Sequence, residues 1–263
     1  MSKMLRKLEN TVARFSESLN QPLSEGIFFL HLPKCGGSSI AAALRSCYRS
    51  QRDSMASLNS FGSSNAAELL NMPVLQFREQ ILLYYMGQEK IRYVAGHFPF
   101  SQTAFELFHD RFAFITVLRD PVPRWISEYF FNRYKKSPHN RHDMPIEEFL
   151  ESDKGRDQGC QYVRFLANPN AQDDLRSASV IDQAKQNLLK VDLVGFVEHQ
   201  HDFVRQFHER FGRKLNIGHL NKNPKAKQDQ QALLTDDIME RITAVCRPDI
   251  EIFQFAVENF SSK

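Results

Sequence analysis

The sequence predicts an α/β domain with a central, mainly parallel sheet flanked by helices. Short apolar runs rich in β-branched and aromatic residues alternate with longer segments of helical periodicity, which is typical of a layered α/β fold. The chain has 263 residues, of which 42% are hydrophobic, so it can bury a sizeable core. We therefore expect a single domain over residues 1–263, with residues 1–22 as a helical extension.

Three apolar runs predict the buried strands of this sheet. Residues 27–31 read "IFFLH", residues 112–118 read "FAFITVL" and residues 192–196 read "DLVGF". A shorter strand is expected at 92–95. Strands of a parallel sheet are covered on both faces, so they appear as nearly continuous apolar runs.

Helices are expected between and after these strands. Leu5, Leu8, Val12, Phe15 and Leu19 recur at helical spacing and predict an amphipathic helix before residue 22. Asp120-Pro121 predicts a helix start, because aspartate is a good cap and proline is tolerated at the first helical position. That helix is expected to run to Tyr134. The other expected helices are 38–48, 74–86, 145–152, 158–167, 178–189, 199–211, 236–246 and 248–260.

Two polar segments predict surface loops. Residues 50–65 are rich in serine, and residues 137–145 read "SPHNRHDMP". The formal net charge of +3 is too small to favour a nucleic-acid partner. Four widely spaced cysteines without a CxxC pair favour reduced thiols. With neither an apolar signal segment nor an apolar run long enough for a membrane span, we expect a soluble, cytoplasmic protein.

The segment "HLPKCGGSSI", residues 31–40, follows the first strand and predicts an anion site. Gly36 and Gly37 let the backbone approach a ligand closely, and the helix that follows offers free N–H groups and the positive end of its dipole. Lys34 adds a full charge, and the next two serines add hydroxyl donors. In the common nucleotide P-loop the lysine follows the glycines, whereas here it precedes them. The alternative is a plain strand–turn–helix junction with an incidental lysine.

The segment "VLRDPVPRWIS", residues 117–127, is a second strand-to-helix junction. Arg119 stands where the strand ends, and Ser127 lies two helical turns further on. A guanidinium fork and a hydroxyl can together bind a second phosphate. Ligands of parallel sheets bind at the carboxyl ends of the strands. We therefore expect Arg119 and Lys34 on the same rim of the sheet.

The two motifs resemble those of the PAPS-dependent sulfotransferases. "HLPKCGGSSI" is similar to their 5′-phosphosulfate loop, commonly PKTGGTS, and "VLRDPVPRWIS" to their 3′-phosphate motif. "AGHFPF", residues 95–100, resembles the GH motif of the carbohydrate branch, which includes the heparan sulfate 2-O-sulfotransferases and bacterial relatives. "DLVGFVEHQHDFVRQF" and "HLNKNP" resemble later blocks of that branch, so the likeness runs from about residue 27 to 260.

The resemblance implies a P-loop-like three-layer fold, PAPS as co-substrate, PAP as product, and a hydroxyl-bearing acceptor, a glycan or glycoconjugate. It implies donor binding by Lys34, Cys35, Gly36, Gly37, Ser38, Ser39, Arg119 and Ser127. Lys34 is also expected to stabilise the leaving group, so no metal is required. Cys35 replaces the usual threonine and loses a hydroxyl contact. We expect no membrane anchor like that of the family's Golgi members, which favours a bacterial-type soluble enzyme.

The histidine of the carbohydrate branch's GH motif serves as catalytic base, so the resemblance implies this role for His97. A histidine also titrates near neutral pH, and Gly96 is expected to leave room beside it. His31 is the rival for that role, although it is more readily explained as orienting the lysine loop. Lys222 could close over the nucleotide, and Cys35 could be a reactive thiol or a small space-filling residue. An acidic glycan could contact four basic residues, Arg133, Lys135, Lys136 and Arg141, or these could be a solvated helix end and loop. A sugar ring could contact four aromatic residues, Tyr129, Phe130, Phe131 and Tyr134, or half of these could belong to the core.

Two other functions compete with sulfuryl transfer. A P-loop kinase-type phosphotransferase would need a lysine after the glycines and a magnesium-binding carboxylate at a strand end. A non-catalytic module that binds an anionic nucleotide or glycan would have no need of a base at His97. The sequence indicates no oligomeric state and does not name the acceptor.

Overall fold

The central sheet of the protein is parallel throughout. The computed structural model describes residues 23–137, 139–218 and 230–261. Within them, five strands form one sheet in the order β2-β3-β1-β4-β5, and every neighbouring pair is parallel. The strands are β1 (Gly26–Leu30), β2 (Met55–Ser57), β3 (Tyr93–Gly96), β4 (Phe112–Leu118) and β5 (Leu193–Phe196). The prediction of a mainly parallel α/β sheet is confirmed.

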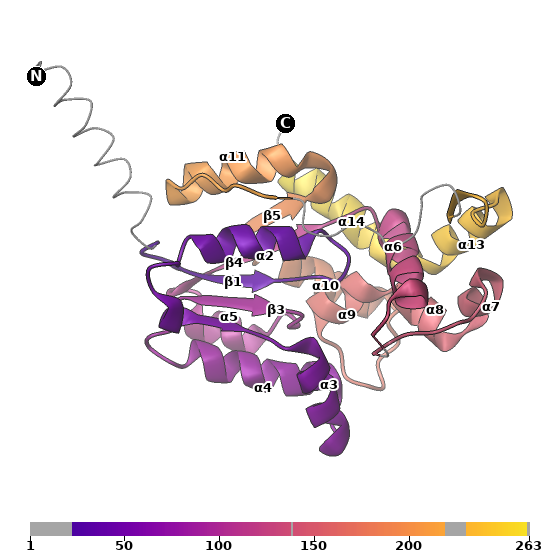
Figure 1. Ribbon diagram of the computed structural model, residues 1–263, viewed down its shortest axis with the longest axis horizontal. Helices are drawn as coiled ribbons and strands as arrows, with labels where there is room; N and C mark the ends of the chain where they lie inside the picture. The colour runs from indigo at the N-terminus through magenta and orange to yellow at the C-terminus, as the bar shows by residue number, and fades with distance from the viewer. Residues whose placement is uncertain (1–22, 138, 219–229, 262–263) are drawn as a thin grey trace, which may run out of the picture.

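Helices cover both faces of this sheet and complete three layers (Figure 1). Side chains of a strand alternate between faces, so Phe28 and Leu30 of β1 pack into one core cluster, and Ile27 and Phe29 pack into another. The first cluster lies against α4 (Val74–Met86), α5 (Gln102–Phe108), α9 (Gln161–Ala167), α10 (Ala178–Leu188) and α14 (Arg247–Phe260). The second lies against α2 (Gly37–Ser46) and α11 (Gln200–Phe211).

A third core cluster lies beyond the carboxyl ends of the strands, at the right of Figure 1. It joins α6 (Pro121–Tyr134), α7 (Ile146–Glu151) and α13 (Asp236–Val245), with α8 (Asp153–Gln158) beside them. The rings of Trp125 and Tyr129 stack at 5.7 Å, and Trp125 Nε1 donates to the carbonyl oxygen of Gly155 at 3.0 Å. This packing fixes α6, which carries Ser127.

Most predicted elements are present with their ends moved by one or two residues. The strand at 112–118 and the helix at 74–86 have the predicted bounds. Asp120 caps α6 as expected, because its Oδ1 accepts the N–H of Val122 at 3.0 Å. Described residues between Tyr134 and Ile146 form neither helix nor strand, so the predicted loop there is confirmed. The predicted N-terminal helix and "HLNKNP", with Lys222, lie outside the described residues.

The predicted loop at 50–65 is wrong. This segment contains a short 3₁₀ turn (Arg52–Ser54), β2, and most of α3 (Ser60–Leu69). Asn59 caps α3 by accepting the N–H of Gly62 at 2.8 Å, and Ser64 donates to the Ser60 carbonyl oxygen at 2.9 Å. The serines are therefore satisfied within a helix, and the residues before them add an edge strand to β3.

The helix predicted at 158–167 is present as α9, which begins at Gln161, whereas α8, which ends at Gln158 before Gly159, was not predicted. A Cβ atom on Gly159 would lie 2.2 Å from the carbonyl oxygen of Val245, so the close approach of α13 requires glycine here. Helix α5 was not predicted. It begins at Ser101, whose hydroxyl accepts the N–H of Ala104 at 3.0 Å. None of the described helices is both long and apolar enough to cross a membrane.

Candidate active site

Three neighbouring strands bring the predicted site residues to one edge of the sheet. His97 follows β3, the lysine loop follows β1 and Arg119 follows β4, and these strands lie side by side in parallel. Nη1 of Arg119 donates to the carbonyl oxygen of Lys34 at 3.4 Å. The prediction that Lys34 and Arg119 share a rim is therefore confirmed.

The lysine loop is a tight turn at the start of α2. Lys34 and Gly36 both have left-handed backbone conformations, with φ of 64° and 66°. This conformation costs a residue with a side chain about 1–2 kcal/mol. Gly36 is the N-cap of α2, and Gly37, Ser38 and Ser39 form its first turn. The positive end of the helix dipole therefore faces the loop without an acidic side chain in that turn to offset it.

The Lys34 ammonium lies among aromatic and charged neighbours. Its Nζ is 3.8 Å from the centroid of the Phe131 ring. Burial lowers the pKa of Lys34 to about 8, against the opposing effect of Glu128 and with help from the cations Arg119 and Lys135. A bound anion would favour the protonated form and raise this pKa again. Lys34 is therefore a cation whose charge is only partly balanced within the protein.

Arg119 is fixed through its backbone, and Ser127 lies two turns into α6. The backbone N–H of Arg119 donates to the hydroxyl of Tyr162 at 2.9 Å. Ser127 is half-buried. Cys35, in contrast, is only 1% exposed, and its Sγ lies 3.4 Å from the same Tyr162 hydroxyl oxygen.

The Cys35 side chain belongs to the core. Burial raises the pKa of its thiol to about 11, which disfavours the nucleophilic thiolate. The hypothesis of a reactive thiol is therefore wrong, and the alternative of a small space-filling residue is confirmed. Only the backbone of Cys35 is placed to contact a ligand in the loop.

His97 is held in one tautomer by the end of β1. Its Nδ1 lies 2.6 Å from the carbonyl oxygen of His31. A carbonyl oxygen can only accept, so Nδ1 carries the proton and Nε2 keeps a free lone pair. Burial lowers the pKa of His97, and the nearby cations Arg78 and Lys34 lower it further, against the hydrogen bond to His31. This neutral state is the one that a general base requires.

His31 packs between His97 and the lysine loop. The two imidazole rings are 4.4 Å apart, and burial lowers the pKa of His31 to about 3, with a further contribution from His97. A Cβ atom on Gly37 would lie 2.0 Å from the His31 ring, so this ring forms the underside of the loop. The expectation that Gly96 leaves room beside His97 is wrong, because Leu58 fills that space.

The family profile of the sulfotransferases matches residues 23–256 of the chain. The protein belongs to the sulfotransferase family. Membership implies transfer of a sulfuryl group to an acceptor that offers a hydroxyl. A comparison with curated proteins found no match.

One residue in contact with the candidate site was missed by the sequence analysis. Arg78 of α4 is 7% exposed, and its Nη1 donates to the carbonyl oxygen of His97 at 3.1 Å. Its Nε and Nη2 donate to the hydroxyls of Ser63 at 3.1 Å and Ser64 at 3.2 Å. The available signal was its position: Arg78 lies between Leu75 and Leu82 on the apolar stripe of the helix, where a charge is unusual.

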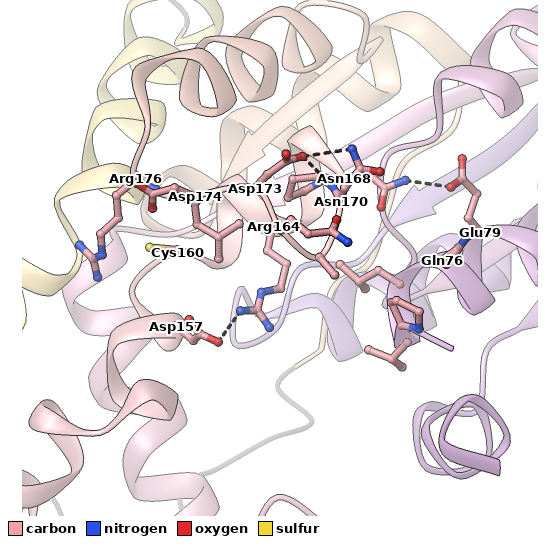
Figure 2. Close-up of a pocket in the computed structure, with 17 residues that line it drawn as sticks. Gln76, Glu79, Asp157, Cys160, Arg164, Asn168, Asn170, Asp173, Asp174 and Arg176 are labelled. Carbon is pink, nitrogen blue, oxygen red and sulfur yellow. Dashed lines mark hydrogen bonds and ion pairs between the residues drawn. The ribbon is translucent and has the colours of Figure 1, made fainter. Parts of the chain in front are cut away.

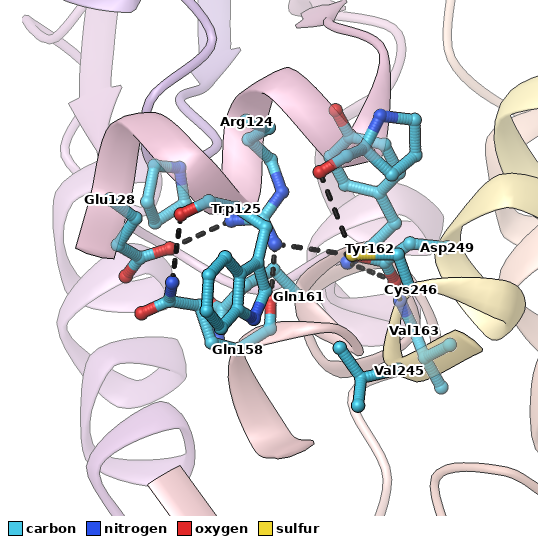
Figure 3. A network of polar contacts seen from close by, with 12 residues as sticks. Arg124, Trp125, Glu128, Gln158, Gln161, Tyr162, Val163, Val245, Cys246 and Asp249 are labelled. Atoms are coloured by element: carbon cyan, nitrogen blue, oxygen red, sulfur yellow. Dashed lines mark hydrogen bonds and ion pairs between the residues drawn. The ribbon is translucent and has the colours of Figure 1, made fainter. Parts of the chain in front are cut away.

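A second arginine in the sulfotransferase motif is committed to the core. Arg124 is fully buried, and its Nη1 donates to Glu128 Oε2 at 2.7 Å, while Nη2 lies 3.7 Å from Asp249 Oδ2 (Figure 3). Asp249 Oδ1 accepts the N–H of Tyr162 at 2.8 Å and of Val163 at 3.2 Å. Asp249 of α14 therefore caps the first turn of α9, and Arg124 is not available to a ligand phosphate.

A cavity of about 780 Å³ lies between α4, α8, α9 and the segment 168–176 (Figure 2). Arg164 pairs with Asp157 at 2.6 Å, and Asn168 donates to Glu79 at 2.9 Å. None of the residues expected to bind the donor lines this cavity. Its lining residues Glu79 and Arg164 are the chain neighbours of Arg78 and Phe165, which both contact His97.

The predicted basic group after α6 is divided by the fold. Arg133 donates to the Tyr129 hydroxyl at 3.0 Å, and Arg141 pairs with Asp143 at 3.4 Å. Lys135 lies 5.5 Å from the Phe131 ring, on which Lys34 also packs. Of the predicted aromatic residues, Tyr129 and Phe130 are buried in the core, whereas Phe131 is 41% exposed. Lys135 and Phe131 thus remain as candidates for contact with an acceptor.

Proposed function

We propose that this sulfotransferase moves a sulfuryl group from PAPS to a hydroxyl of a carbohydrate acceptor. The observation that carries the proposal is the meeting of the two anion motifs, where Arg119 donates to the Lys34 carbonyl oxygen at 3.4 Å. PAPS carries a 5′-phosphosulfate and a separate 3′-phosphate. Two adjoining cationic sites at one sheet edge match such a donor better than a ligand with a single phosphate.

The chemistry of the site residues fits this donor. The left-handed turn at Lys34 and Gly36 precedes the start of α2, and Arg119 reaches the same loop by donating to the Lys34 carbonyl oxygen at 3.4 Å. The N–H of Ser39 donates to the Gly36 carbonyl oxygen at 3.2 Å, so Lys34, the N–H groups of 36–38 and the backbone of Cys35 would hold the 5′ side. Arg119 and Ser127 would hold the 3′-phosphate. Bound PAPS would supply the sulfuryl group and the leaving 5′-phosphate.

Lys34 would act on the leaving group. Charge builds up on the leaving oxygen during sulfuryl transfer, and a preorganised ammonium with several N–H groups stabilises such charge. Burial makes this contribution larger than it would be in water, because the local dielectric constant is lower. Removal of one such donor typically costs about 10²–10³ in rate. The role requires no metal ion.

His97 would remove the proton from the acceptor hydroxyl. Its Nε2 has the free lone pair, because Nδ1 donates to the His31 carbonyl oxygen at 2.6 Å. The lowered pKa keeps the ring neutral at physiological pH. We assign His31 the role of supporting the loop and the His97 ring, since it packs against both.

The acceptor would approach from the side of the cavity. Amide and carboxylate side chains line it, among them Gln76, Asn168, Asn170 and Asp173, and such groups bond well to sugar hydroxyls. Four carboxylates and two arginines line the cavity. This charge favours a neutral glycan over a polysulfated one in this part of the site.

The same proposal places the protein in the carbohydrate branch, as a bacterial-type enzyme of one catalytic domain in the cytoplasm. All four cysteines are unpaired and buried, which suits a reducing compartment. A kinase is disfavoured, because the strand-end carboxylate of Asp120 is engaged in capping α6 and the lysine precedes the loop glycines. A pure binding module is disfavoured by the tautomer of His97.

Transfer of labelled sulfate from PAPS to a panel of glycans, lipids and small alcohols tests the proposal. We expect label on a glycan hydroxyl, release of PAP, and unchanged activity in EDTA. Phosphate transfer from ATP that EDTA abolishes and magnesium restores would instead establish the kinase. Binding of PAP without transfer to any acceptor would support the non-catalytic module.

A further inference from the structure

A single buried phenol joins the two halves of the donor site. Tyr162, at the start of α9, accepts the backbone N–H of Arg119 at 2.9 Å and donates its own proton to the carbonyl oxygen of Arg119. The sulfur of Cys35, in the lysine loop, lies 3.4 Å from the same phenol oxygen. Tyr162 thus contacts both anion motifs, although it lies more than forty residues from Arg119 in the sequence.

The contacts to Arg119 constrain the direction of its side chain. Bonds to both the N–H and the C=O of one residue fix the peptide groups on its two sides, and hence the path along which its Cβ leaves the chain. The Cys35 contact fixes the lysine loop relative to the same oxygen atom. The separation between the two cationic groups is therefore set by Tyr162.

The position of Tyr162 is itself fixed by burial and by a hydrogen bond to α14. Its ring is fully buried, and its own N–H donates to Asp249 Oδ1 at 2.8 Å. Asp249 is held by α14 and lies 3.7 Å from Arg124 of α6 (Figure 3). The phenol is therefore anchored to the helix that carries Ser127, and to the helix that caps α9.

We propose that Tyr162 is a positioning residue that sets the distance between the lysine loop and Arg119, and so makes the site selective for nucleotides carrying both a 5′- and a 3′-phosphate. This inference rests on the proposed PAPS-dependent function. A ligand with two anionic groups on a stiff ribose is bound well only if both receptor groups are held at the matching separation. A ligand with the 5′-phosphate alone does not sense that separation.

Calorimetry with PAP and AMP on the full-length protein tests the inference, because AMP lacks the 3′-phosphate. Tyr162→Phe keeps the ring and removes only the hydroxyl. We expect the ratio of PAP affinity to AMP affinity to fall about tenfold, which corresponds to about 1.4 kcal/mol. Tyr48→Phe is the matched control. Tyr48 is equally buried and loses one hydrogen bond, to the Glu25 carbonyl oxygen at 2.7 Å, at the other end of α2.

The outcomes are distinct. Loss of selectivity in Tyr162→Phe but not in Tyr48→Phe, at a similar decrease in Tm, supports the inference. Unchanged selectivity in a folded Tyr162→Phe variant overturns it and leaves Tyr162 as a core residue. If Tyr162→Phe does not fold, Cys35→Ala removes the contact on the loop side. A fall in the ratio of PAP affinity to AMP affinity in that variant supports the inference, and an unchanged ratio overturns it. A wild-type protein that binds PAP and AMP equally overturns the donor assignment, and the inference with it.

Discussion

The proposed donor side and the proposed acceptor side of the site are built differently. On the donor side, the lysine loop and Arg119 are held by the buried hydroxyl of Tyr162, and α9 beneath them is capped by Asp249. On the proposed acceptor side, partly exposed side chains line the cavity, among them Arg164 paired with Asp157 at 2.6 Å. Phe131, at the end of α6, is 41% exposed and packs against lysine ammonium groups.

This difference matches what each side has to recognise. A donor of fixed shape calls for groups held at fixed positions, and buried hydrogen bonds hold them. Exposed aromatic and charged side chains can change rotamer with little cost, so the acceptor side can change its ligand without disturbing the core. Substitutions on the donor side should therefore alter nucleotide binding or turnover strongly, whereas those on the acceptor rim should not.

The largest effect is expected for His97, which lies between the two sides. His97→Ala should lower turnover by about 10²–10⁴-fold and leave PAP affinity unchanged, because a general base acts on the acceptor proton alone. The wild-type pH–rate profile should have an acidic limb below pH 6.5, since the pKa of His97 is lowered from that value and the ring loses activity only when protonated. His97→Ala should lack this limb.

His31→Ala is the control for this prediction. It should weaken donor binding through the loop and keep the acidic limb. Loss of the limb in His31→Ala, with the limb intact in His97→Ala, would show that His31 is the base.

The next effect is expected for Lys34. Lys34→Ala should lower turnover by about 10²–10³-fold, because the developing charge on the leaving oxygen loses its ammonium partner. Lys135→Ala is the matched control for Lys34→Ala, since Lys135 packs on the same Phe131 ring. It should change turnover by less than about threefold, as for a screened surface charge. Equal losses in the two variants would abolish the contrast between the sides.

A smaller effect is expected for Arg119, and on binding alone. Arg119→Ala should weaken the binding of PAP by about 10–100-fold, the usual scale for a lost hydrogen bond to a charged group. The affinity for AMP should not change. Calorimetry measures both affinities. Arg111→Ala serves as the control, because Arg111 lies at the opposite end of β4 and donates to the Met86 carbonyl oxygen at 3.1 Å. Parallel weakening of PAP and AMP in Arg119→Ala would contradict a role at the 3′-phosphate.

The smallest effect is expected for Arg78, as a change in the pKa of His97. The charged and titratable neighbours of His97 are His31, Lys34 and Arg78. Removal of a cation favours protonation, so Arg78→Met should raise the pKa of His97. Arg78→Lys keeps the charge and should leave that pKa close to wild type. NMR titration of the imidazole measures the shift, and an equal shift in both variants would show that the charge is not its cause.

The sequence was sufficient for four of the five strands and for the meeting of the two predicted anion motifs. Runs such as "FAFITVL" can only be buried strands in a layered domain, and parallel pairing places the residues that follow them at one edge. The meeting of Lys34 and Arg119 followed from that rule alone. The helix at 121–134 was predictable because Asp120 and Pro121 act locally on the backbone.

The missed features depend on contacts between distant segments. Serines at 60–64 favour a loop by composition, and only the cap at Asn59 and the donors of Arg78 make a helix of them. The roles of Arg78 and Tyr162 follow from which atoms their polar ends reach, and helical or strand periodicity carries no information on that. Cys35 was assigned to the donor by its place in the motif, although its side chain lies in the core.

The ring of His31 occupies the volume that a side chain at position 37 would need, with only 2.0 Å between the two. Position 37 can therefore carry a side chain only if the residue at 31 is smaller than histidine. An alanine at 37 becomes sterically acceptable once the residue at 31 is small, and that smaller residue would also remove the support of the His97 ring. Under the proposed function, evolution of this loop is thus tied to evolution of the base at His97, so that a drift in nucleotide preference would carry a change in the pH range of activity with it.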